Sequence, residues 1–264
     1  MADIMQKIRN DITVESVLMA AIKMPGVKIK RDVFLRKELL KYCSEEEIEL
    51  AIKYNPAKAG ISKEIINKIS KSVITYETNK VSAISVAASL PSSAAPVAAV
   101  GAASADIYSY FAHIIRVAQE LAYLYGFKQF NLKDDEIDSD TMTSLMYFIG
   151  TMLGVQEAAI QLNKLANTMA NHVAKNLARK ALTKGTVYPI VKQIATKIGI
   201  RMTKQVFADT VASAIPIAGS VLSGGLTYAM FRPSCMNLRK KLMSYNLCDP
   251  DYYRVVADVQ AEET

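Results

Sequence analysis

Two carboxylates and a histidine follow one another along one predicted helix, and such residue types can bind a metal ion or transfer protons. Asp106, Tyr110, His113, Arg116 and Glu120 lie at offsets of 0, 4, 7, 10 and 14, so they share broadly one helix face. Metal ligands on one helix usually lie three or four residues apart, whereas each carboxylate here is seven residues from His113. We therefore interpret the row as a polar seam, a weak candidate site in which Asp106 or Glu120 pairs with Arg116 or with another basic residue.

Other signatures of catalysis are missing from the sequence. The run from Gly219 to Thr227 resembles a phosphate-binding loop, but Gly225 occupies the position where that loop needs lysine. There is no H-E-x-x-H, G-x-S-x-G or G-x-G-x-x-G pattern. The three cysteines have no metal-ligand spacing, which fits free thiols in a reducing compartment. The sequence thus predicts no catalytic residue, no metal and no cofactor, and a lipid-directed enzyme stays open only on the carboxylates and histidine of the seam.

The charge distribution favours an anionic partner. The chain of 264 residues is 51% hydrophobic and has a net charge of +7, and Ala158 to Ala208 carries nine positive charges without one acidic residue. Such a run suits phospholipid headgroups or nucleic acid. Only Tyr188 and Phe207 interrupt it as aromatic residues, and single-strand binding needs more of them. We expect anionic membrane lipids as partners and do not expect nucleic acid.

A first uncharged stretch extends from Val81 to Ala105 and is rich in Ala, Ser and Val. Pro91 and Pro96 break it in the middle, because proline removes a helical hydrogen bond and clashes with the preceding turn. The pattern predicts one helix, a turn through the two prolines, and a second helix that returns through Asp106 to Gly126. This is a helical hairpin.

A second uncharged stretch, Thr210 to Phe231, has basic residues on both sides. Ile215–Pro216 and Gly219 lie where the tip of a second hairpin is predicted, which leaves arms of about 7 to 12 residues, too short to cross a bilayer core of about 30 Å. Because positive charge marks the cytoplasmic side, we expect this segment to enter the membrane and return to the same side. The predicted membrane-insertion residues are Ile215, Pro216, Ile217, Val221 and Leu222. The predicted anion-binding residues are Lys175, Arg179, Lys180, Lys184, Arg232 and Arg239. A buried hairpin in a soluble helical core remains the alternative.

Local signals place several helix ends. Ser44 and Glu47 form a capping-box pattern that opens a helix at Glu45, and Asn55–Pro56 ends or interrupts that helix. Ser62 is the expected N-cap of a longer helix. Gly150 and Gly154 form a G-x-x-x-G pattern within Thr141–Gln156, which we interpret as a buried packing face.

These patterns predict an all-α multi-helix bundle built around two Pro/Gly-interrupted helical hairpins, packed with the Thr141–Gln156 helix. We divide the chain into an N-terminal helical module (1–78), a hairpin core (79–245) and an acidic C-terminal tail (246–264) that we expect to be disordered. The N-terminus has charged residues where a signal peptide needs an apolar run, which favours a cytoplasmic location.

Three segments resemble the EcsC family of bacterial proteins. They are KRDVFLRKELL through NPAKAGIS, then DIYSYFAHIIRVAQELAYLYG, and finally KGTVYPIVKQIATKIG with AIPIAGSVLSGGLTYAMF. The likeness extends from about Lys30 to Leu242 and is most specific in the last two segments. The resemblance implies a membrane-associated helical protein without established catalytic residues, and the family is named for a gene beside components of an ABC exporter.

We therefore expect a non-enzymatic protein at the cytoplasmic leaflet that uses a re-entrant hydrophobic hairpin and a basic face. Two alternatives stay open. One is a soluble regulatory or scaffold protein that docks an acidic partner such as a transporter component or a stress system. The other is a membrane-permeabilising effector, whose small-residue hairpins could pack into a homo-oligomer.

Overall fold

The computed structural model describes residues 14–89, 97–132, 137–171, 189–194, 196 and 216–262, and the regular elements among them are helices. The predicted all-α multi-helix bundle is confirmed. The elements with assigned bounds are α2 (Val14–Ile22), α3 (Arg31–Leu39), α4 (Glu45–Lys53), α5 (Lys63–Ser89), α6 (Val97–Leu124), α7 (Ser139–Met152), α8 (Gln156–Ala170), α12 (Pro216–Leu242), a 3₁₀ turn η1 (Asn246–Cys248) and α13 (Pro250–Glu262).

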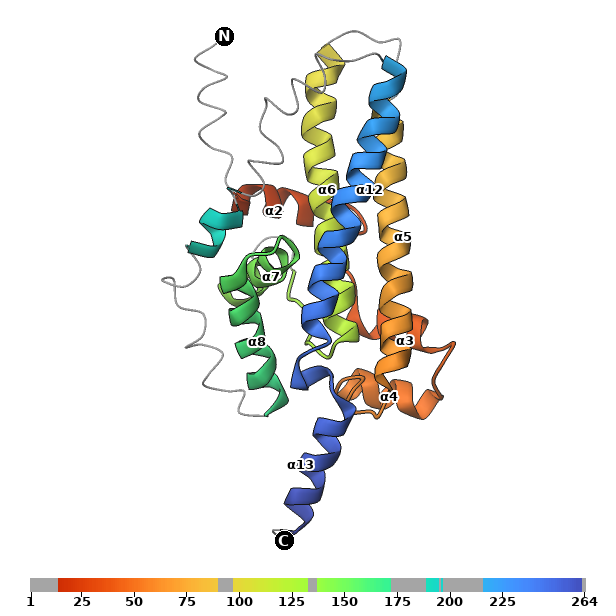
Figure 1. Ribbon diagram of the computed structural model, residues 1–264, viewed down its shortest axis with the longest axis vertical. Coiled ribbons are helices and arrows are strands. Elements are labelled where there is room, and N and C mark those ends of the chain that lie inside the picture. The colour runs from red at the N-terminus through yellow and green to blue at the C-terminus, as the bar shows by residue number, and fades with distance from the viewer. Residues whose placement is uncertain are drawn as a thin grey trace.

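The three longest helices, α5, α6 and α12, lie side by side (Figure 1). The end of α5 at Ser89 and the start of α6 at Val97 lie at the same end of the bundle, as the arms of the predicted first hairpin require. The predicted turn between them, residues 91–96, lies outside the described residues. The start of α12 at Pro216 lies at this end too, so the two uncharged stretches of the sequence meet there.

The glycines of the second uncharged stretch do not interrupt a helix. α12 continues through Gly219, Gly224 and Gly225 and even through Pro233, over 27 residues. The expected short arms around Gly219 are therefore wrong for this segment. A glycine costs a helix only about 1 kcal/mol relative to alanine, and the packing of α12 along α5 and α6 outweighs that cost.

The predicted helix ends agree with the structure. At the start of α4, Glu47 N donates to Ser44 Oγ at 3.3 Å and Ser44 N donates to Glu47 Oε2 at 2.7 Å, which completes the capping box. α4 ends at Lys53, just before Asn55–Pro56. Ser62 precedes α5 and its Oγ accepts from Ile65 N at 3.3 Å.

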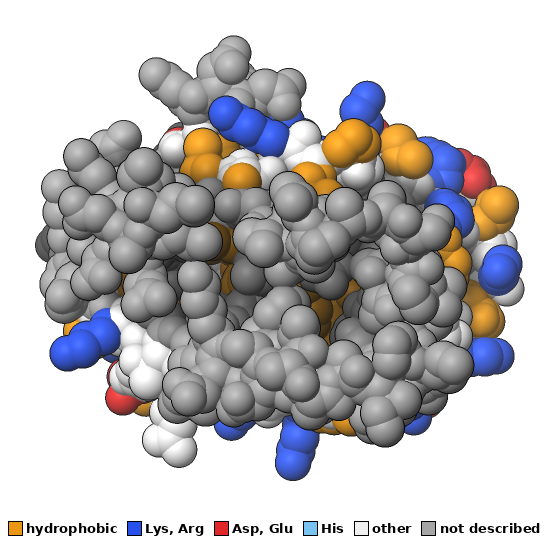
Figure 2. Space-filling model, turned by 90° about the horizontal axis from the view of Figure 1, so that it is seen from above, with side chains coloured by type: hydrophobic (Ala, Val, Ile, Leu, Met, Phe, Trp, Pro, Cys, Tyr) orange, Lys and Arg blue, Asp and Glu red, His pale blue; other side chains and the backbone are white. Residues whose placement is uncertain are grey.

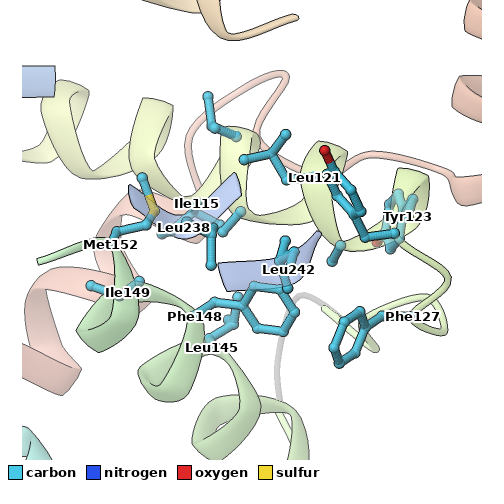
Figure 3. Packing of buried hydrophobic residues seen from close by; sticks show 14 of the residues in the cluster. Ile115, Leu121, Tyr123, Phe127, Leu145, Phe148, Ile149, Met152, Leu238 and Leu242 are labelled. Atoms are coloured by element: carbon cyan, nitrogen blue, oxygen red, sulfur yellow. The ribbon is translucent and has the colours of Figure 1, made fainter. Parts of the chain in front are cut away.

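One hydrophobic core draws on all three predicted segments of the chain. Leu238 and Leu242 of α12 lie between α6, at Ile115, and α7, at Phe148 (Figure 3). α5 continues without a break across the boundary drawn between residues 78 and 79. The tail expected to be disordered forms α13 over Pro250–Glu262, which projects from the end of the molecule opposite the start of α12 (Figure 1).

The two glycines of the G-x-x-x-G pattern have different tasks in the α7–α8 hairpin. A Cβ on Gly150 would lie 2.6 Å from the Cβ of Ala158 in α8, so only glycine permits this approach of the two helices. Gly154 has φ +75° in the turn between them, a conformation that glycine adopts readily. The buried packing face predicted for this segment is confirmed, since Leu145 to Met152 are all buried.

Arg31 holds the N-terminal helices to the end of the bundle. Its Nη1 donates to Ile52 O at 2.6 Å, its Nη2 to Ala51 O at 3.0 Å, and its Nε to Phe127 O at 3.1 Å. The guanidinium thus binds the C-terminal carbonyls of α4, which have no partner within the helix, and fastens them to the loop after α6.

Candidate functional site

The polar seam of α6 lies inside the bundle and contains a carboxylate from α5. His113 Nδ1 lies 2.7 Å from Glu77 Oε2, and Arg116 Nε lies 3.2 Å from Glu77 Oε1. Arg116 Nη2 also contacts Glu120 Oε1 at 3.3 Å, a pair at i and i+4 of the same helix. We call Glu77, His113, Arg116 and Glu120 the buried polar seam.

The same face of α6 binds the backbone of the segment that follows α2. Arg116 Nη1 donates to Gly26 O. Gln119 Nε2 donates to Val27 O at 2.8 Å, and Gln119 Oε1 accepts from Ile29 N at 3.1 Å. The seam therefore joins three parts of the chain, namely α5, α6 and the connection between α2 and α3.

The two carboxylates of the seam have opposite pKa shifts. Burial pushes the pKa of Glu77 upward, but the hydrogen bond from His113 and the charge of Arg116 outweigh it and hold that pKa below its ordinary value. For Glu120, burial and then the charge of Glu77 raise the pKa to about 8, against the opposing charge of Arg116. Glu77 is therefore ionised at neutral pH and Glu120 carries a proton. The single negative charge of Glu77 balances the positive charge of Arg116.

This arrangement is suited to holding helices together. Because ionised Glu77 can only accept, His113 Nδ1 is the donor in their hydrogen bond. Cys235 of α12 is fully buried, and burial raises the pKa of its thiol well above the ordinary value. It is held as a neutral thiol and is a poor nucleophile. In the described part of the chain, no three His, Cys, Asp or Glu side chains are placed to hold a metal ion.

Three of the four seam residues predicted from the sequence lie together, namely His113, Arg116 and Glu120. Asp106 lies in α6, but its side chain is outside the described residues. Glu77 was missed, because it lies 36 residues before His113 and only the packing of the hairpin brings the two together. Its sequence signal is weak: a charged residue in an apolar row of α5.

The predicted anion-binding residues lie in different environments. Arg239 is only 7% exposed, and its Nε donates to Ser70 Oγ at 3.0 Å, next to the Tyr125 hydroxyl. It is a buried link between α12 and α5, which does not suit a headgroup contact. Arg232 is half-buried, and its Nε has no hydrogen-bond partner among the described residues. Lys175, Arg179, Lys180 and Lys184 lie outside the described residues.

The predicted membrane-insertion residues belong to the start of α12. Pro216, Ile217, Val221 and Leu222 lie in its first turns, where side chains are not described, and Ile215 lies outside the described residues. Among the helices that the structure describes, none combines the length and apolar character needed to cross a bilayer.

A shallow depression of about 510 Å³ lies between α3 and α4. Its principal cation, Arg36, is already paired with Glu45 and Glu49. The remaining lining residues are Asp32, Val33, Lys37 and Ile52, which include no serine, cysteine or histidine.

Comparison with models of known protein families, with curated proteins and with solved structures found no match.

Proposed function

We propose that this protein is a non-enzymatic, membrane-associated protein that enters the cytoplasmic leaflet with the uncharged end of the α5–α6–α12 bundle. The observation that carries the proposal is the meeting of two uncharged stretches, 81–105 and 210–231, at one end of the molecule (Figure 1). They are separated by more than a hundred residues of sequence. We call the uncharged ends of the three helices, residues 81–89, 97–105 and 216–231, the wedge. A single apolar helix in a core would not form such an end.

The length of the wedge supports entry into one leaflet. The uncharged part is nine residues long in α5 and in α6, and sixteen in α12, from Pro216 to Phe231. At 1.5 Å per residue these are about 13 Å and about 24 Å. Both are shorter than a hydrocarbon core of about 30 Å, and the shorter length is close to one leaflet of about 15 Å.

The buried polar seam also supports the proposal, because it lies where the wedge joins the rest of the bundle. It joins α5 to α6 through Glu77, His113 and Arg116, about one turn beyond the last uncharged residue of α5. Because a buried carboxylate with two donors resists separation, the arms of the hairpin stay together while their uncharged ends enter lipid.

Positive charge adds attraction to an anionic surface. A basic residue near the surface of such a membrane contributes about 1 kcal/mol, and the chain has a net charge of +7. Figure 2, seen from the uncharged end, shows Lys and Arg side chains around the rim of the molecule. Membership of the EcsC family stays a prediction that rests on the resemblance alone.

The proposal is tested by co-flotation with vesicles of phosphatidylcholine, with and without phosphatidylglycerol. We expect wild type to float with the anionic vesicles and less so in high salt. Ile217→Asp/Val221→Asp should abolish flotation, as should Pro216→Asp, which places an acid where a helix start favours one and so preserves folding. The matched control is Val33→Asp/Val255→Asp, which makes the same change at two exposed valines away from the wedge.

Each outcome has a definite meaning. Wild type that stays at the bottom with every vesicle overturns the proposal and favours a soluble protein that docks a partner. Equal loss of flotation in the wedge and control variants would indicate unspecific adsorption and would also overturn it. Release of an entrapped dye at the same protein concentration would favour the permeabilising effector.

A further inference from the structure

Basic residues resume at about one level on two of the three wedge helices, α5 and α12, whereas the first charged residue of α6 is Asp106. Lys80 is the first charged residue on α5 counted from the wedge, and Arg232 is the first on α12. The hydrogen bond between Arg239 and Ser70 fixes the register of these antiparallel helices. Since both rise 1.5 Å per residue, Lys80 lies level with Ala229, within one turn of Arg232.

An exposed tyrosine lies beside the first of these cations. Tyr76 is 64% exposed and precedes Lys80 by four residues on α5, so the two side chains share one face of the helix. Lys80 is exposed as well. Tyrosine and lysine on one exposed face are typical of the membrane interface, where the ring lies at the headgroups and the ammonium reaches phosphate. One exposed tyrosine alone would need no explanation; its position on this level does.

The distances along α5 fit the layers of a leaflet. Lys80 lies nine residues and Tyr76 thirteen residues from the last residue of α5, Ser89, which is about 13 Å and about 20 Å. In a bilayer, half of the hydrocarbon core is about 15 Å and the headgroups extend to about 20–22 Å from the midplane. When the end of α5 reaches the midplane, Lys80 lies at the boundary of the hydrocarbon and Tyr76 lies among the headgroups.

The hydrogen bonding and the direction of the Arg232 side chain agree with a position at the headgroup level. Its Nε is buried and has no hydrogen-bond partner among the described residues. A side chain on a helix leans toward the N-terminus, which in α12 is the wedge end, so the guanidinium leans toward the membrane. Arg232 as a whole is only half-buried, and a guanidinium is suited to binding phosphate.

We infer that Tyr76, Lys80 and Arg232 form an interfacial belt that binds the phosphates of anionic phospholipids and stops insertion of the wedge at one leaflet. This inference rests on the proposed function and adds to it the depth of insertion and the residues that set it. Tyr76 and Lys80 are new here, since no sequence pattern marked them.

The depth is measured with a fluorescent reporter. The chain has no tryptophan, so Tyr76→Trp gives a single indole at the belt and Tyr54→Trp gives one at an exposed position on the end of α4. Vesicles of phosphatidylcholine and phosphatidylglycerol carry bromine either near the headgroup or near the end of the acyl chain. We expect Tyr76→Trp to be quenched by the shallow bromine and little by the deep one, and Tyr54→Trp by neither.

The contribution of the charges of Lys80 and Arg232 to binding is measured with the same vesicles without bromine. Lys80→Gln should weaken binding about fivefold, the equivalent of one basic residue at an anionic surface, and Arg232→Gln should do the same. Lys71→Gln is the matched control, because Lys71 is also exposed on α5 but lies nine residues farther from the wedge. It should bind as wild type does.

The outcomes separate this inference from the proposed function. If wild type does not float, the proposed function fails. If wild type floats while Tyr76→Trp is unquenched, or is quenched mainly by the deep bromine, the belt is overturned although the protein binds membranes. Equal affinities of Lys80→Gln and Lys71→Gln overturn it as well.

Discussion

Nδ1 of His113 lies 2.7 Å from Oε2 of Glu77, and this hydrogen bond joins α6 to α5 in the interior of the bundle. The Glu77 side chain is fully inaccessible to solvent. Its second oxygen accepts from Arg116 Nε, so one buried carboxylate from α5 binds two donors on α6. The hairpin is therefore held by a charged contact in addition to its apolar packing.

Removing the charge of Glu77 should destabilise the fold. Glu77→Gln leaves Arg116 with only the protonated Glu120 nearby, and breaking a buried ion pair costs about 3–5 kcal/mol. We expect a loss of about 3 kcal/mol in the free energy of unfolding, measured by urea denaturation at pH 7. Glu46→Gln makes the same change at an exposed position of α4 and should stay within about 0.5 kcal/mol of wild type. Equal stability of the two variants would contradict a stabilising role of the seam.

Glu120 should make the fold less stable as the pH rises. Its pKa is about 8 in the folded protein against an ordinary value of 4.5. Between these values the folded state keeps a proton that the unfolded state releases, so stability falls by up to about 1.4 kcal/mol per pH unit. Glu120→Gln removes this effect.

The measurement compares urea unfolding of wild type and Glu120→Gln at pH 5.5, 7 and 8.5. We expect the free energy of unfolding of the variant, relative to wild type, to increase with pH and to level off above pH 8. Groups that both proteins share cancel in the difference. A difference that does not change with pH would show that Glu120 is ionised at neutral pH.

Gly150→Ala should destabilise the α7–α8 hairpin through a steric clash with Ala158. Overpacking of this kind costs about 1–3 kcal/mol, and thermal unfolding should show it. Gly150→Ala/Ala158→Gly restores the space and should recover most of the loss. Gly150 lies within α7 and has no left-handed φ, so backbone strain does not contribute to the effect. A double variant no more stable than Gly150→Ala would rule out the clash.

Arg31 and Arg36 should respond differently to the same substitution. Lysine cannot reproduce the fork with which Arg31 binds carbonyl oxygens of α4 and of the loop after α6. We expect Arg31→Lys to cost about 1–3 kcal/mol, since buried carbonyls lose their donor. Arg36→Lys should cost clearly less than Arg31→Lys, because the ion pairs of Arg36 are exposed. Urea denaturation measures the stability of both variants. A larger loss for Arg36→Lys than for Arg31→Lys would contradict the role given to the Arg31 guanidinium.

The sequence predicted those features that depend on neighbours along the chain. The capping box of Ser44 and Glu47 and the N-cap at Ser62 need only contacts three residues apart, and each stands where predicted. α5 ends at Ser89 and α6 begins at Val97, on either side of the segment that contains the two prolines, as the local effect of proline on a helix predicts.

Features that depend on tertiary packing were harder to predict. Nothing near Glu77 in the sequence indicates that it faces His113, and nothing near Arg239 shows that α12 buries it against Ser70. Gly219 is misleading for the same reason: its weakness as a helix former is local, and the contact of α12 with α5 is not.

Cys235 has a practical consequence, since it lies at the contact of α12 with the two arms of the hairpin. Its side chain is fully buried, and burial keeps the thiol protonated. A thiol reagent can reach it only after α12 has moved away from α5 and α6. The rate at which Cys235 is alkylated therefore reports how often the bundle opens, and no cysteine has to be introduced for this measurement.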